Sequence, residues 1–539
     1  MKKRIVWWLV IVVVFVAGYY VWSHRFGVPE DFTDPAAAYK YGSIGADHPM
    51  ALAPIPFWIW KVLPELVPPS AEEFKKLDAG PWNGKKGFEA FGLVTEAGME
   101  HPQGFKQGDT VFDRPIGLSK RTVFGIDFVG VNCAFCHLTT IRRLPDEKPI
   151  IILGGTGNSL NIEQYFLYMF ATMGDKKRFN ADDVMEKVSD EVRKQNKDLS
   201  FVERLVYRYV AIPLIPRILE ARKKEYFDFI TAGNKYRLKN FGPGRVDTWA
   251  LYKRLYVNPK QPSDVDDKVI NGIVDFPSIW NQRARAGMQM HWDGNIAVAE
   301  ERNIISALSV IGTRLDYLDF PRLTRTAEFA NRLIPLRYED WIPEQFRVGN
   351  QRIQQDLAER GRGLFQNHCA SCHAPDGDRV GRVEPNEGLV TDSERLRDFT
   401  PELADGLNRL GTDAWKLRNF KPQHGYVNAL LDGIWLRAPY LHNGSVPTLR
   451  DLLDKAEDRP AKFCTGNDEY DWKNVGFKSA TKTGNGDAIC GEYFLYDTTV
   501  SCNESKPTDR CGNGNAGHLY GTDLNEKDKA DLLEFLKTL

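Results

Sequence analysis

The chain has 539 residues, more than one hydrophobic core usually serves, so its length predicts two to four domains. Lysine and arginine number 71, aspartate and glutamate number 72, and the resulting net charge of -1 argues against a nucleic-acid-binding protein. A hydrophobic fraction of 42% and a charged fraction of 27% are those of a globular protein, and they exclude a disordered chain, a collagen-like repeat and a multi-span membrane protein.

Residues 1–26 have the pattern of a signal anchor. Basic residues at positions 2–4 precede an uncharged apolar run over residues 5–22, which at about 1.5 Å per residue nearly spans the hydrocarbon core of a bilayer. The basic flank should stay in the cytoplasm, which places the rest of the chain on the other side. A cleaved signal peptide is the alternative, but cleavage needs small residues where this run ends in bulky ones.

Three segments are expected after the anchor. Residues 27–129 are rich in glycine, proline and aromatic residues without helical periodicity, and we expect an irregular segment that wraps the next domain. Residues 130–340 and 341–539 each contain one cysteine motif and are expected to be two separate domains. The fold class predicted is mainly α with long loops.

Helical periodicity predicts an insertion in the first domain, at about 174–240. Within it we expect helices over 181–195 and 201–208, and a break at Pro213 and Pro216. The second domain is expected to contain helices over 351–367 and 526–539.

Each of the two domains contains a C-x-x-C-H sequence, the pattern that attaches c-type haem. Two thiols on one turn can bond to the two vinyl groups of a haem, and the adjacent histidine then lies beneath the iron as its ligand. Chance gives about 0.002 matches in a chain of this composition, and a zinc site would need both cysteine pairs to converge on one ion. We therefore predict two covalent haem c groups, bound by Cys133, Cys136 and His137 and by Cys369, Cys372 and His373.

The remaining four cysteines lie in a tail rich in glycine, asparagine and aspartate. An even number of cysteines in an exported chain predicts disulfides, here two with three possible connectivities. The connectivity that joins neighbouring cysteines in the sequence pairs Cys464 with Cys490 and Cys502 with Cys511.

Whether a haem iron has a second protein ligand distinguishes an electron-transfer haem from a reactive one. All eight methionines precede Cys369, so a histidine–methionine iron is disfavoured at the second motif. The candidates after that motif are His424, His442 and His518, with a tyrosine or an open site as alternatives. No second ligand is clearly placed for the first iron.

Several segments resemble the bacterial dihaem cytochrome c peroxidase superfamily: the two haem motifs, Trp292-Asp293-Gly294 between them, and the stretch from Ala438 to Ser445 after the second. The resemblance covers roughly Gly130 to the C-terminus. It implies that Trp292 lies between the haems and takes part in electron transfer. It also implies that the haem of His137 is reactive and that the haem of His373 transfers electrons.

The chain departs from the peroxidases in two places. Ala456 stands where they have a methionine ligand, and the N-P-x-E-M segment after W-D-G is missing; residues 295–308 instead predict an amphipathic helix with Glu300 and Glu301. A closer resemblance is to the rubber-oxygenase-like branch of dihaem oxygenases. This resemblance rests on four segments, 130–133, 153–158, 275–282 and 512–518. It implies that His518 is the second ligand of the second haem iron. It also implies that His442 contacts a haem propionate.

These resemblances favour an oxygenase that activates O₂ at the first haem, in a pocket without a strong acid or base, to oxidise an apolar lipid, isoprenoid-like or polymer substrate. The alternatives are a peroxidase that reduces H₂O₂ with electrons from a small redox protein, for which His291 or Glu300 would move the proton, and a non-catalytic electron-transfer cytochrome. The expected location is the periplasmic side of the bacterial inner membrane, or outside the cell if residues 1–26 are cleaved. Ca²⁺ is a further candidate cofactor, and no nucleic-acid partner is expected.

Overall fold

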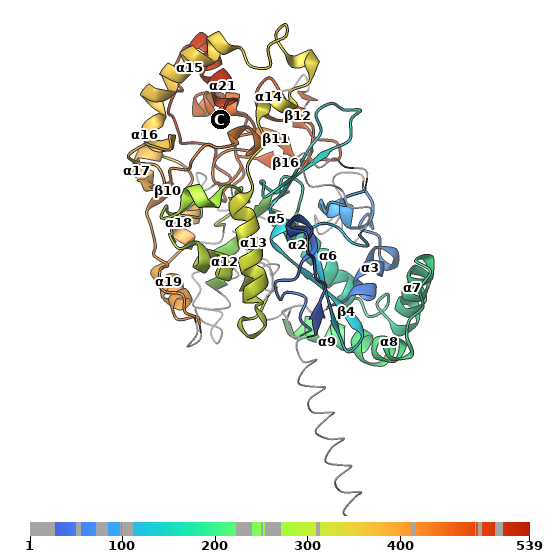
Figure 1. The fold of residues 1–539 in the computed structure, drawn as a ribbon. Helices are drawn as coiled ribbons and strands as arrows, with labels where there is room; N and C mark the ends of the chain where they lie inside the picture. The colour runs from blue at the N-terminus through green and yellow to red at the C-terminus, as the bar shows by residue number, and fades with distance from the viewer. Residues whose placement is uncertain are drawn as a thin grey trace, which may run out of the picture.

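The computed structural model describes most of the chain (Figure 1). The predicted anchor, residues 1–26, lies outside the described residues, and so does Cys502. None of the helices in the described part is both long and apolar enough to cross a membrane. The described residues are 27–49, 55–71, 85–97, 99, 112–222, 240–249, 252–253, 271–308, 313–411, 415–479, 481–482, 488–501 and 510–539.

A four-stranded antiparallel sheet occupies part of the N-terminal segment that we expected to be irregular. Its strands lie in the order β1-β3-β4-β2. The turn between β3 and β4 is Phe124-Gly125, where the φ angles of 51° and 79° suit a two-residue hairpin turn. β4 ends one residue before the first haem motif begins, so the sheet positions that motif. The strands are β1 (Val28–Pro29), β2 (Ile55–Pro56), β3 (Leu118–Val123) and β4 (Ile126–Val131).

The first helix expected in the insertion is confirmed as α7 (Ala181–Lys194). Asn180 caps its N-terminus, and three valines at helical spacing face the core: Val184, Val188 and Val192. The described part of this insertion ends at residue 222.

The break expected at Pro213 and Pro216 is wrong. Helix α8 (Phe201–Val206) continues through a π-helical turn, η2 (Tyr207–Ala211), into α9 (Ile212–Arg222). Pro213 lies in the first turn of α9, directly after the π turn has shifted the backbone hydrogen-bond pattern, so its missing N–H is tolerated. The result is one long helix on the surface instead of two short ones.

Small hairpins and helices surround the first haem motif. Strand β5 pairs with β6 immediately after His137, and β7 pairs with β8 farther along the chain. These elements are α2 (Pro35–Tyr41), α3 (Phe57–Leu66), α5 (Cys133–Cys136), β5 (Leu138–Ile141), β6 (Ile150–Leu153), α6 (Ile162–Gly174), β7 (Arg245–Val246), β8 (Val274–Asp275), α12 (Ala299–Leu308), α13 (Phe320–Arg332) and α14 (Tyr338–Trp341).

The second haem motif follows α15 (Gln355–His368), which packs on the C-terminal helix α21 (Glu526–Leu536). Both helices were predicted, although α15 begins at residue 355 and not 351. Gly361 makes the close approach possible, because a Cβ there would lie 2.0 Å from the carbonyl oxygen of Asp531. The Arg360 guanidinium binds both carboxylate oxygens of Asp531, at 2.7 and 2.8 Å.

Short elements fill the rest of the second half. They are α16 (Ala370–His373), β9 (Val383–Pro385), α17 (Asn386–Leu389), α18 (Glu394–Asp398), α19 (Pro401–Asn408), β10 (Gly425–Val427), α20 (Leu449–Leu452), β11 (Lys462–Thr465), β12 (Tyr470–Asp471), β13 (Gly476–Phe477), β14 (Thr481–Lys482), β15 (Ala488–Ile489) and β16 (Phe494–Asp497). Helices and small sheets therefore share the fold, and the expectation of a mainly α protein holds only in part.

One apolar core joins the two halves of the chain. Trp280 and Ile152 from the first half belong to the same buried cluster as Trp435 and Trp472 from the second. The sheet and α6–α9 lie at one end of the molecule and α15 and α21 at the other, so the two haem motifs lie between these ends (Figure 1).

Candidate functional site

The first motif forms a single helical turn, α5, held by the residue before it. Asn132 caps the turn, because its side chain accepts a hydrogen bond from the N–H of Ala134 and donates to the carbonyl of Gly42, both at 3.0 Å. Cys133 and Cys136 form no disulfide. Burial raises the pKa of the Cys133 thiol to about 11 and raises that of Cys136 as well. Two neutral thiols on one turn suit covalent attachment of a haem.

His137 is oriented by a backbone carbonyl. Its Nδ1 lies 2.8 Å from the carbonyl oxygen of Pro277, which only accepts hydrogen bonds, so Nδ1 carries the proton and Nε2 is left as a ligand atom. Burial lowers the pKa of His137 to about 4, which keeps the ring neutral at physiological pH. This is the arrangement that a proximal histidine needs.

The second motif repeats this arrangement. Nδ1 of His373 lies 2.7 Å from the carbonyl oxygen of Ala429, and burial lowers the pKa of the ring. Burial also raises the pKa of the Cys369 thiol to about 11 and that of Cys372 above its ordinary value. The two motifs therefore present the same set of groups for a covalent haem.

His518 faces His373 across the second motif. The centres of the two rings are 6.1 Å apart. With metal–nitrogen bonds of about 2.0 Å and a ring centre about 1.2 Å behind each nitrogen, two axial rings on one iron lie about 6.4 Å apart. Nδ1 of His518 is buried and has no hydrogen-bond partner among the described residues. His373 and His518 would therefore be able to hold one haem iron between them.

Arg459 holds the loop that carries His518. Its buried guanidinium donates hydrogen bonds to the carbonyl oxygens of Asn515 at 2.6 Å, Gly517 at 2.8 Å and His518 at 3.3 Å. The N–H of His518 donates to the carbonyl of Leu389 at 3.0 Å. This arginine was missed in the sequence, because nothing in the pattern relates position 459 to a loop 56 residues later.

The other two candidate ligands lie elsewhere. His442 is buried against Tyr426, with Nε2 3.1 Å from the phenol oxygen and the two rings stacked at 4.2 Å. The phenol donates to the carbonyl of Asp392 at 2.6 Å, so Nε2 of His442 donates to the phenol oxygen. His424 is exposed to solvent. Of the three, His518 is the one that faces His373.

Trp292 connects the two motifs through its hydrogen bonds. Its indole N–H donates to the carbonyl of Asp275 at 2.8 Å, two residues before Pro277, whose carbonyl holds His137. Its own carbonyl accepts from the N–H of Val427 at 3.0 Å, two residues before the alanine that holds His373. A route of short backbone segments and hydrogen bonds therefore joins His137 and His373.

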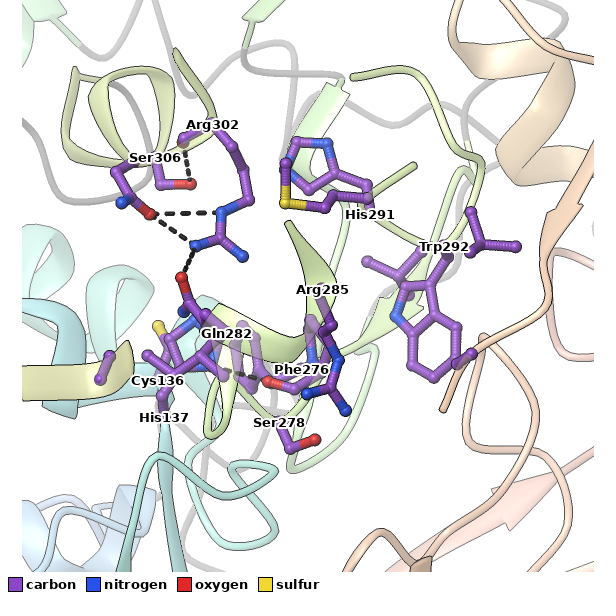
Figure 2. Close-up of a pocket in the computed structure, with 18 of the residues that line it drawn as sticks. Cys136, His137, Phe276, Ser278, Gln282, Arg285, His291, Trp292, Arg302 and Ser306 are labelled. Atoms are coloured by element: carbon purple, nitrogen blue, oxygen red, sulfur yellow. Dashed lines mark hydrogen bonds between the residues drawn. The ribbon is translucent and has the colours of Figure 1, made fainter. Parts of the chain in front are cut away.

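A cavity of about 250 Å³ opens beside the first motif and extends toward the second. Figure 2 shows Cys136 and His137 at one side, His291 and Arg302 across from them, and Trp292 at the far end. Apolar side chains supply much of its wall, among them Tyr252, Phe276, Ile279, Met290, Leu323 and Ala330.

The wall opposite His137 carries two polar groups, His291 and Arg302. Nδ1 of His291 lies 2.7 Å from the side-chain oxygen of Asn295, and burial lowers its pKa to about 4. Arg302 binds the side-chain oxygens of Gln282 and Asn303, and burial lowers its pKa to about 10, so it stays cationic at neutral pH. Its guanidinium lines the cavity across from His137 (Figure 2).

The two glutamates predicted on this segment do not line the cavity. Glu301 accepts hydrogen bonds from the backbone N–H groups of Arg418 and Asn419, and Glu300 is exposed. Helix α12 begins at Ala299, later than the expected start at 295. The sequence could have indicated Arg302 as a cavity residue, because it lies one residue after Glu301 on the same amphipathic helix.

Two partly buried arginines also line the end of the cavity near the second motif. Arg285 and Arg437 both bind Asp432, and burial lowers the pKa of Arg437 to about 10. Nε of Arg437 is buried without a partner among the described residues. A surplus of cations over carboxylates suits the propionates of a haem.

The disulfide expected between Cys464 and Cys490 is confirmed. Cys511 is also disulfide-bonded, while Cys502 lies outside the described residues. The described residues contain no group of three or more histidine, cysteine, aspartate or glutamate side chains suited to a metal ion.

Comparison with known proteins agrees with this geometry. Residues 358–427 match the cytochrome c family, and residues 425–464 match a family described as RoxA-like, cytochrome c-like. The second match includes both Ala429, which holds His373, and Arg459, which holds the His518 loop. The chain is therefore a c-type cytochrome that binds haem covalently.

It belongs to the same family as a rhizobial protein of similar length, and the RoxA-like match covers residues 425–464 of this chain. The uncharacterized protein y4iJ of Sinorhizobium fredii (strain NBRC 101917 / NGR234) is 40% identical over 540 residues, which cover 84% of this chain and 84% of that protein. The uncharacterized protein y4iM of the same strain is 30% identical over 299 residues, 49% of this chain and 64% of that protein. The chain thus spans a little under two thirds of y4iM.

Proposed function

We propose that this chain is a dihaem c-type oxidoreductase with a reactive first haem and an electron-transfer second haem. The observation that carries the proposal is the difference between the two motifs. His373 faces a second histidine, His518, at ligand distance, whereas His137 faces a cavity. The His373 site would therefore provide both protein ligands of its iron, whereas the His137 site leaves room for an external ligand.

The chain's own residues prepare the first site. A haem bound there supplies redox chemistry on an oxygen ligand. Cys133 and Cys136 fix the group covalently, and the carbonyl of Pro277 sets which nitrogen of His137 faces the iron. The buried wall keeps bulk water away from the reacting atoms.

Trp292 is the proposed electron relay between the two sites. Its hydrogen bonds to Asp275 and Val427 fix the indole on the route between the proximal histidines. Trp292→Phe removes one hydrogen bond and should slow electron transfer between the haems without changing haem content. Flash photolysis of the CO-bound, half-reduced protein measures that rate, and an unchanged rate would contradict the relay.

Oxidation of an apolar substrate by O₂ is the first candidate reaction. It is supported by the RoxA-like match and by the apolar part of the cavity wall. The substrate class proposed is an unsaturated lipid, an isoprenoid-like molecule or a polymer of such units, whose chain would lie along residues such as Phe276 and Ile279.

Reduction of H₂O₂ is the second candidate, and the polar wall favours it. The reaction takes one peroxide, two electrons and two protons to two waters, with a small reduced redox protein as the electron donor. Cleavage of the O–O bond needs a group that moves a proton between the oxygens. His291 is neutral at physiological pH and able to accept that proton, while Arg302 places a positive charge beside the developing anion.

One set of assays separates these candidates. The purified holoprotein is incubated with candidate lipids under O₂, with product analysis by mass spectrometry, and separately with H₂O₂ and reduced cytochrome c. His291→Leu should lower peroxide consumption by about 10²–10⁴-fold if the second candidate holds, while Glu300→Gln, on the exposed side of the same segment, should have no effect. Two low-spin irons that bind no external ligand would contradict both candidates and leave a non-catalytic electron-transfer cytochrome.

The proposed location is the periplasmic side of the inner membrane. The Cys464–Cys490 disulfide supports an oxidising compartment, and both interpretations of residues 1–26 export the rest of the chain. A small electron-transfer protein is the proposed partner, and the charge balance gives no support for a nucleic acid.

A further inference from the structure

Half of the exposed large apolar side chains in the described part of the chain lie at one end of the molecule. We call this group the apolar end patch. Phe201 is 76% exposed, Tyr209 67% and Val28 66%. The patch comprises Val28, Phe124, Phe201, Val202, Leu205, Tyr209, Val210 and Leu214.

The long helix formed by α8, η2 and α9 supplies most of the patch. Phe201, Leu205 and Tyr209 repeat at a spacing of four residues, which places them along one face. A regular α-helix would carry Leu214 around to another side. The π turn η2 has more residues per turn and rotates the second half of the helix back, so that the apolar face continues toward Leu214.

The opposite face of this helix is buried in the protein core. Tyr207, Ile212, Ile215 and Leu219 are buried against the sheet and α6. An amphipathic surface helix normally presents charged residues to water, whereas this one presents a second apolar stripe. That stripe needs a covering that the described part of the chain does not supply.

The start of the described chain lies beside the patch. Val28 in β1 pairs with Thr122, and Thr122 pairs with Asp127 across the β3–β4 hairpin. The Asp127 carboxylate lies near enough to Tyr207 in η2 to affect the pKa of its phenol. Strand β4 and helices α8 and α9 lie at the same end of the molecule (Figure 1). The apolar run at residues 5–22 therefore ends a few residues before this surface.

Charge also favours a membrane at this end. Residues 201–222 contain four arginines and two glutamates, and a surplus of basic residues beside an apolar face is typical of helices that lie in the headgroup region of an anionic bilayer. Tyrosine and phenylalanine are suited to the same depth.

We propose that the apolar end patch lies in the surface of a lipid bilayer, as a second membrane contact beside the N-terminal segment. It would fix the orientation of the molecule on the membrane, with α15 and α21 farthest from the lipid (Figure 1). The proposal does not depend on the reaction of the haems.

Spin labels on the full-length holoprotein test this proposal. Leu205→Cys is labelled in the patch, and Ile334→Cys provides a control, because Ile334 is apolar and 72% exposed but lies outside the patch. Each protein is mixed with vesicles of phosphatidylethanolamine and phosphatidylglycerol. The label at 205 should become accessible to O₂ and shielded from a water-soluble nickel chelate, while the label at 334 stays accessible to the chelate.

Three results would overturn the proposal. In the first, the label at 205 is as accessible to the nickel chelate as the label at 334. In the second, it is shielded from both reagents with and without vesicles, which indicates that a protein surface covers the patch. In the third, the holoprotein does not bind the vesicles at all.

Discussion

Arg459 offers the sharpest test of how the second haem site is built, because it contacts no proposed ligand atom. Arg459→Met removes three hydrogen bonds to the carbonyl oxygens of the loop over 515–518, at 2.6, 2.8 and 3.3 Å. Hydrogen bonds from a charged group contribute about 1.5–3 kcal/mol each and overlap when they share a donor, so we expect a loss of about 3–5 kcal/mol. A loss of about 3 kcal/mol shifts the balance between bound and released His518 more than a hundredfold.

The readout is the spin state of the second iron. Absorption and EPR spectra of Arg459→Met should show part of that iron converted from low-spin to high-spin, and added imidazole should restore the low-spin signal. Arg450→Met is the matched control, because Arg450 binds Asp454 and Glu526 and none of the three carbonyls. A folded Arg459→Met protein with an unchanged spectrum would refute the reasoning.

Three further changes test other parts of the molecule. His518→Ala should make the second iron high-spin with both haems still attached, as measured by absorption and mass spectrometry, whereas the exposed His424→Ala should leave the spectrum unchanged. Burial lowers the pKa of His442 to about 3 from an ordinary 6.5, so between these values the unfolded chain binds a proton that the folded chain does not. The unfolding free energy should therefore fall as pH falls through this window, and His442→Gln should reduce that slope by about 1.4 kcal/mol per pH unit; an equal slope in chemical denaturation would contradict the argument. Replacing Cys464 and Cys490 by serine opens a loop of 26 residues and should cost about 3–4 kcal/mol of stability, and an unchanged denaturation midpoint would show that the loop is held by other contacts.

Features that depend on neighbouring residues in the sequence could be predicted. Helices α7 and α21 follow from apolar spacing and capping residues, and the Cys464–Cys490 bond follows from local pairing in an oxidising compartment. The C-x-x-C-H motifs indicated covalent haem for the same reason, since the chemistry is contained in five consecutive residues.

Features that depend on distant contacts could not be predicted. The groups that orient His137 and His373 are backbone carbonyls, which every residue possesses, so no residue type at Pro277 or Ala429 reveals them. The cavity wall carries Arg302 and not the predicted glutamates, because adjacent positions on a helix point about 100° apart. That rotation turns Glu301 toward the backbone of residues 418–419 and leaves Arg302 facing the cavity.

The second site is closed by residues that come late in the chain. The motif ends at His373, but His518 and the helix α21 that packs on α15 are both made long afterwards. The two histidines that face each other there are therefore separated by more than a hundred residues of chain. In the proposed function, a chain interrupted after residue 500 would keep both C-x-x-C-H motifs but lack the histidine that closes the second iron. In the proposed function, the last few dozen residues therefore decide whether the second haem transfers electrons or reacts with external ligands.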